Sequence, residues 1–128
     1  MTAKNAAIIL GVTFIAVGIL GYTSNPIIGP DEALFHTDSL HNIVHLVSGA
    51  LFLLVAVAFP GSVRSFLKIF GVVYLFLGIL GLFTIGSDGT THLLGFLHVN
   101  GADNYLHIVL GLVIFLAGML RETKTIRV

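Results

Sequence analysis

Four stretches of the chain are apolar and lack Asp, Glu, Lys and Arg: residues 5–30, 39–63, 69–87 and 104–120. A helix that crosses the hydrocarbon core of a bilayer needs about 20 apolar residues. We therefore expect transmembrane helices near residues 6–23, 40–59, 66–85 and 104–120. Pro60 and Gly61 end the second helix, because both residues break helices. The pattern predicts an all-α fold: a polytopic four-helix membrane bundle that forms one domain over residues 1–128.

The composition is typical of a protein that faces lipid rather than water. Hydrophobic residues make up 56% of the chain and charged residues 9%, and the mean hydropathy is +1.05. A soluble domain carries roughly 25% charged residues. The net charge of zero argues against nucleic acid as a partner, because such binding needs a basic face. The expected partners are the lipid bilayer and either further copies in a homo-oligomer or a larger membrane complex.

The basic residues set the expected orientation. With four spans, every Lys and Arg lies on one side: Lys4, Arg64, Lys68, Arg121, Lys124 and Arg127. By the positive-inside rule that side is the cytoplasm, so both termini should be cytoplasmic. The outer side then carries Asp31, Glu32, Asp38, Asp88 and Asp103 together with all six histidines, His36, His41, His45, His92, His98 and His107.

The chain also aligns with itself. Residues 11–21 match residues 71–81 at six of eleven positions. With an offset of two more residues the following helices align as well, placing His36, Asn42, His45, Val47 and Gly49 on His98, Asn104, His107, Val109 and Gly111. The bundle is therefore expected to consist of two parallel two-helix repeats, residues 6–60 and 66–120, related by an axis along the membrane normal.

One motif, N-x-x-H-x-x-x-G, occurs in both predicted repeats as Asn42/His45/Gly49 and Asn104/His107/Gly111. Its spacing places each set on one helical face, and polar residues inside a membrane usually face the bundle interior. Three interpretations follow. The Asn and His side chains hydrogen-bond across the bundle, or His45 and His107 share a haem, a chlorophyll-type pigment or a metal ion, or they line a proton or ion path. The glycines either pack helices tightly or clear room for a flat cofactor.

A metal site at the outer end is a related hypothesis. His41 and His45 share a helical face at a spacing used for metal ligands, and Asp103 aligns with His41 in the second repeat. Carboxylates also bind metals, so His41, His45, Asp103 and His107 form a candidate metal set. The remaining histidines, His36, His92 and His98, are expected to be solvated in the linkers 24–39 and 86–103, where no strand pattern is evident.

The run from Thr37 to Gly49 and its echo from Asn104 to Gly111 resemble a bacterial membrane family known as domain of unknown function 4383. The resemblance implies small four-helix proteins of the bacterial inner membrane with no established activity. It carries over no catalytic residues.

No pattern in the sequence indicates a catalytic site, so an enzyme is not expected. The leading expectation is a non-enzymatic structural or accessory subunit that acts through helix contacts. The alternative is a haem-, chlorophyll- or metal-binding subunit that uses His45 and His107.

Overall fold

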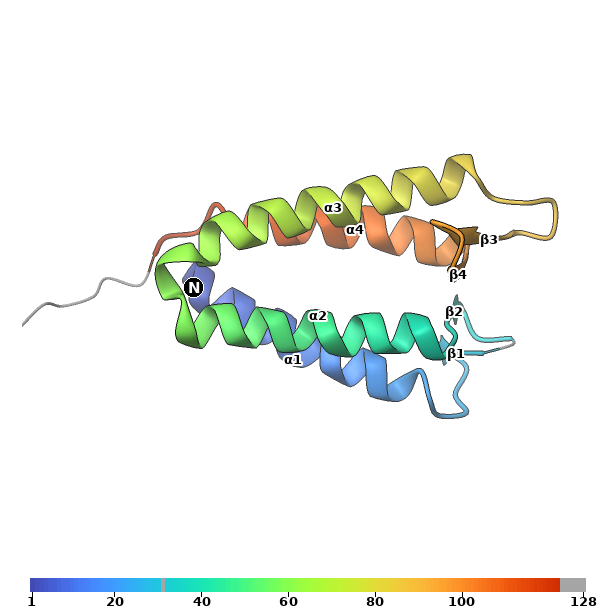
Figure 1. Ribbon diagram of the computed structural model, residues 1–128, viewed down its shortest axis with the longest axis horizontal. Coiled ribbons are helices and arrows are strands. Elements are labelled where there is room, and N and C mark those ends of the chain that lie inside the picture. Colours follow the sequence, from blue (N-terminus) through green and yellow to red (C-terminus); the bar gives the residue numbers. More distant parts are fainter. Residues whose placement is uncertain (31, 123–128) are drawn as a thin grey trace, which may run out of the picture.

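Polar caps begin the first two helices of the computed structural model, which describes residues 1–30 and 32–122 (Figure 1). Helix α1, Ala3–Leu20, follows Thr2, whose side chain accepts a hydrogen bond from the backbone N–H of Asn5. Helix α2, Ser39–Ala58, follows Asp38, which accepts from the N–H of His41 at 2.8 Å. These caps satisfy backbone donors that have no partner within a helix.

The other two helices begin after a turn and after a strand. Helix α3, Val63–Phe83, follows the short 3-10 helix η1, Pro60–Ser62. Helix α4, Gly101–Ala117, starts with a reciprocal cap between Asn100 and Asp103. The predicted bounds of α2 are correct within one residue, whereas α1, α3 and α4 lie two to three residues closer to the N-terminus than predicted. The start signals lie in polar residues just before the apolar runs, which is why hydropathy alone misplaces these helix starts.

The helices identify a membrane protein. Three helical stretches are long and apolar enough to cross a bilayer: Ala3–Leu20, Ser39–Ala58 and Pro60–Phe83. Helix α4 is apolar but shorter, with 17 residues, or about 26 Å at about 1.5 Å per residue. It packs along the length of α3, as α2 packs along α1 (Figure 1).

Four short strands in the α1–α2 and α3–α4 linkers correct the expectation that the linkers contain none. Strand β1, Ile28–Gly29, pairs in parallel with β2, Phe35–His36, and β3, Thr90–Leu93, pairs antiparallel with β4, Leu97–Asn100. The β3–β4 turn has positive φ angles at Leu94 and Gly95. Its apolar residues pack inward on the helices, and this burial favours a hairpin in a segment too polar to span a membrane.

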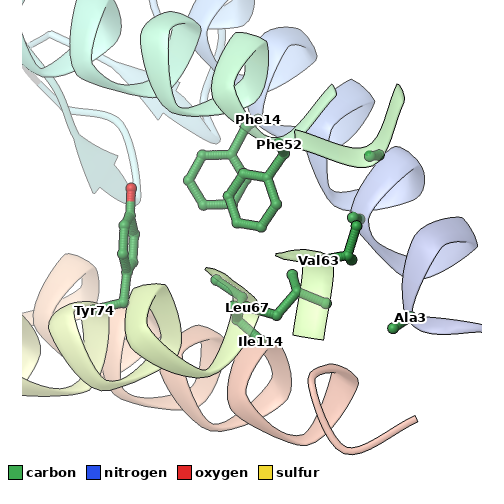
Figure 2. Close-up of a cluster of buried hydrophobic side chains, with 9 residues drawn as sticks. Ala3, Phe14, Phe52, Val63, Leu67, Tyr74 and Ile114 are labelled. Atoms are coloured by element: carbon green, nitrogen blue, oxygen red, sulfur yellow. The ribbon is translucent and has the colours of Figure 1, made fainter. Parts of the chain in front are cut away.

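Aromatic side chains fill the space between the α1–α2 pair and the α3–α4 pair. Phe14 and Phe52 stack with ring centroids 5.3 Å apart, and both belong to one buried cluster with Leu67, Tyr74 and Ile114 (Figure 2). Tyr74 reaches from α3 toward the α1–α2 pair in the same view. The core thus joins the two helix pairs and adjoins His45 and His107 through Phe14 and Tyr74.

Glycines make the closest helix contacts within each pair. A Cβ built on Gly11 would lie 3.0 Å from the carbonyl oxygen of Gly49, and a Cβ on Gly71 would lie 2.7 Å from that of Gly111. Close approach of backbones at small residues is typical of membrane helices. The two contacts involve positions that align in the predicted repeats.

The described basic residues gather at the end opposite the strands. The N–H of Ala3 donates to the carbonyl oxygen of Arg121 at 3.0 Å, and Arg64 Nε donates to that of Gly118 at 3.3 Å. Arg64 also lies 3.8 Å from a carboxylate oxygen of Glu122. The expected orientation also depends on Lys124, Arg127 and Asp31, which lie outside the described residues.

Candidate functional site: a buried histidine centre

Three histidines meet at the end of the bundle that carries the strands. His41 and His45 lie one turn apart on α2, and His107 lies on α4. Each offers a ring nitrogen, and these nitrogens lie within 4.8 Å of one another. All three side chains are buried, with exposed fractions of 2%, 8% and 6%. The structure therefore brings together three of the four residues predicted as metal ligands.

Asp103, the fourth predicted ligand, lies outside this group. Its carboxylate accepts a hydrogen bond from the backbone N–H of Asn100 at 2.8 Å and another from the backbone of His36. Both bonds satisfy backbone donors at the start of α4 and in β2. The described geometry thus groups three of the four predicted ligands and leaves Asp103 in a capping role, and the four-residue metal set stays a prediction.

The backbone of β4 orients His41. Its Nδ1 atom lies 3.2 Å from the carbonyl oxygen of His98. A carbonyl only accepts hydrogen bonds, so this contact selects the tautomer with the proton on Nδ1 and leaves the Nε2 lone pair free. Histidines that bind metals almost always donate their other N–H in this way.

The other two histidines have unused ring nitrogens. The Nδ1 atoms of His45 and His107 are buried and have no hydrogen-bond partner in the described part of the chain. An unsatisfied buried polar group costs about 1–3 kcal/mol. Two such atoms lie beside a third imidazole, that of His41.

Two aromatic rings hold these imidazoles in place. Phe14 contacts His45 edge-on with ring centroids 5.8 Å apart, and Tyr74 contacts His107 in the same way at 5.5 Å. Phe14 and Tyr74 occupy aligned positions in the predicted repeats. Sequence reasoning missed both rings, although the alignment of residues 11–21 with 71–81 already places an aromatic residue at both positions.

The asparagines and glycines of the motif lie away from the histidine nitrogens. The Asn42 carboxamide oxygen occupies the place that a Cβ on Gly21 would take, and Asn104 does the same at Gly81. Neither this Asn42 oxygen nor the side-chain atoms of Asn104 have hydrogen-bond partners among residues 1–30 and 32–122. The expected hydrogen bonds across the bundle are thus not made by these atoms.

Gly49 and Gly111 face neighbouring helices. A Cβ on Gly49 would lie 2.7 Å from the carbonyl oxygen of Gly11, and one on Gly111 would lie 2.7 Å from that of Gly71. The adjacent backbone fills the space beside each glycine, which supports tight helix packing rather than room for a flat ring.

The remaining three histidines, His36, His92 and His98, lie in the strands β2, β3 and β4. The rings of His92 and His98 stack at 4.8 Å and 5°, and His36 lies 4.1 Å from His98 between ring centroids. Burial lowers the pKa of His98, and the neighbouring His36 and His92 lower it further. His92 is exposed as expected, whereas His36 and His98 are half-buried.

The comparisons with known proteins give one match. The sequence model of a family described as Domain of unknown function (DUF4383) matches residues 4–120. No curated protein and no solved structure matches the chain.

Proposed function

Because the chain belongs to the family described as Domain of unknown function (DUF4383), we propose a function from its own site: a membrane protein that binds one divalent transition-metal ion. The ligands are His41, His45 and His107. The single observation that carries the proposal is the convergence of three buried ring nitrogens within 4.8 Å. Imidazole suits zinc, copper, iron and nickel, and the chain has no cysteine to compete as a ligand.

The geometry favours a metal ion over a macrocycle. The cavity beside His45 and His107 has a volume of about 150 Å³, which suffices for one benzene-sized ring. A haem or chlorophyll-type pigment contains four such rings and needs several times this space. Gly49 and Gly111, which were candidates for providing it, are pressed against neighbouring helices.

The proposal places the metal at the outer face of a bacterial inner membrane. Lys4, Arg64, Lys68 and Arg121 belong to the opposite end of the bundle, which the positive-inside rule assigns to the cytoplasm. The protein then acts as an accessory, non-enzymatic subunit that holds a metal near the outer surface. Much of its helix surface is apolar and exposed, which suits contact with lipid or with other membrane subunits.

Metal analysis of purified protein tests the proposal. The protein would be stripped with a chelator, dialysed against Zn²⁺ or Cu²⁺, and measured by elemental analysis and thermal unfolding. We expect one ion per chain and a stabilisation of about 2.7 kcal/mol when the free metal concentration is about 100 times Kd.

Two variants provide the comparison. His45→Gln/His107→Gln removes two ligands and should lose both the ion and the stabilisation, whereas His92→Gln changes an exposed histidine and should retain both. The metal proposal is contradicted if the wild-type protein binds no metal and the double substitution leaves its thermal stability unchanged. The role as a structural subunit would then be the better explanation.

A further inference from the structure

A cavity of about 150 Å³ lies beside the histidine centre, between α1 and α4. Its walls are apolar and include Phe14 and Val17 from α1 and Leu106 and Leu110 from α4. Leu106 is 37% exposed and lies on the lipid-facing side of the bundle. The cavity is therefore placed where a molecule dissolved in the bilayer can reach it between the two helices.

Polar residues close the other end of the cavity. Asp103, whose carboxylate accepts a capping hydrogen bond, lines it, as do Thr37, His45 and His107. Their Oγ1 and two Nδ1 atoms are buried without hydrogen-bond partners among the residues that the structure describes. The Thr37 side chain is 1% exposed, so water outside the bundle does not satisfy it. Three unpartnered polar atoms at one end of an apolar cavity indicate a ligand with a single polar group.

The opposite side of the bundle shows what fills the corresponding space. Val17 and Leu106 align with Leu77 and Val44, which face the gap between α2 and α3. There the β3–β4 hairpin inserts three buried apolar side chains, Leu93, Leu97 and Val99. In the described residues of the loop between α1 and α2, strands β1 and β2 pair in parallel instead of forming a hairpin, and on that side the cavity remains.

We propose that this cavity binds a phenol or quinol ring from the bilayer, with its hydroxyl oxygen against Thr37, His45 and His107. A cavity of this volume lined by apolar side chains accommodates a benzene-sized ring. A phenolic hydroxyl donates one hydrogen bond to an imidazole nitrogen and accepts one from a threonine hydroxyl. The proposal rests on the proposed function: with the metal bound, the hydroxyl oxygen occupies the coordination position that three histidine ligands leave open. Without the metal, an imidazole nitrogen accepts the hydrogen bond from the hydroxyl instead.

Fluorine NMR of 4-fluorophenol with the purified protein tests this inference. Wild-type protein should bind the probe saturably, and fluorobenzene, which lacks the hydroxyl, should bind at least about tenfold more weakly. Val17→Trp places an indole in the cavity and should weaken 4-fluorophenol binding by at least about tenfold. Val12→Trp, on the same helix at a position 57% exposed to lipid, should leave it unchanged. Leu110→Trp serves as a second cavity-filling variant if Val17→Trp does not fold.

The outcomes separate the two proposals. Saturable binding that depends on the hydroxyl and on Val17 supports the inference. Equal binding by Val17→Trp, or equal affinity for fluorobenzene, overturns it, even if the metal content is one ion per chain. Hydroxyl-dependent binding by a protein that takes up no metal overturns the metal proposal alone, because Thr37 and the imidazoles then hold the ring by hydrogen bonds.

Discussion

The Nδ1 atom of His41 lies 3.2 Å from the carbonyl oxygen of His98, across 57 residues of sequence. This contact ties the start of α2 to β4 and fixes the orientation of the His41 ring. The accepting group is a backbone carbonyl, so the side chain of residue 98 is not needed for it.

The two histidines should therefore respond differently to truncation. His41→Ala removes a proposed ligand, and we expect metal affinity to fall by more than about 100-fold, beyond the range typical of outer-shell changes. His98→Ala keeps the carbonyl and should change affinity by less than about tenfold. Competition with a fluorescent chelator measures both values. Equal losses in the two variants would contradict the assignment of His41 as a ligand.

Gly21 and Gly81 should be intolerant of alanine. An added methyl at either position would fall on the carboxamide of Asn42 or Asn104, and overpacking of this kind costs about 1–3 kcal/mol. Gly61 is the matched control, because a Cβ there meets no atom within 4 Å. Thermal unfolding should show losses for Gly21→Ala and Gly81→Ala and little change for Gly61→Ala. Unchanged stability of the first two variants would show that the asparagines move aside freely.

Asp88 should titrate below its ordinary range. The N–H of Thr90 donates to one carboxylate oxygen at 3.0 Å and the Thr90 hydroxyl donates to the other at 2.9 Å, and these bonds lower the pKa of Asp88. The pKa of Asp88 is lower in the folded state than in the unfolded state. The two hydrogen bonds therefore stabilise the folded turn at pH values above the ordinary pKa of about 3.9. This stabilisation is lost as the pH falls through the pKa of the folded state. Thr90→Val removes the hydroxyl and should raise the pKa of Asp88 in a carbon-detected NMR titration. A pKa that ignores this substitution would contradict the role of the hydroxyl.

Membrane orientation can be tested with single cysteines, because the chain has none of its own. Ser62 and Ser87 are both exposed and lie at opposite ends of α3. A membrane-impermeant maleimide should label Ser87→Cys in intact spheroplasts and Ser62→Cys only after permeabilisation. The reverse labelling pattern would place the histidine centre on the cytoplasmic side.

The sequence predicts the helices well because long apolar runs leave little alternative to membrane spans. It also finds His45 and His107 through the repeated motif, and His41 through its spacing to His45. It does not foresee the capping role of Asp103, whose carboxylate accepts from the backbone at the start of α4. Local sequence cannot show this role in full, because the second donor comes from His36 in a distant loop.

The β3–β4 hairpin marks another limit of the sequence. Its buried residues, Leu93, Leu97 and Val99, do alternate with polar ones, and Gly95 supplies the turn. The segment is short and lies between apolar helices that dominate any hydropathy pattern. The path of β4 over α2 is a tertiary feature, and the His98 carbonyl beside His41 could not be foreseen without it.

The hydrogen bond from the N–H of Ala3 to the carbonyl oxygen of Arg121 brings the beginning of α1 next to the residues that follow α4. A short linker could close the chain there, and new ends could be opened at the exposed Gly61 between α2 and α3. Such a circular permutant would carry the α3–α4 pair first and the α1–α2 pair second. The histidine centre would then form whichever of the two helix pairs comes first in the sequence.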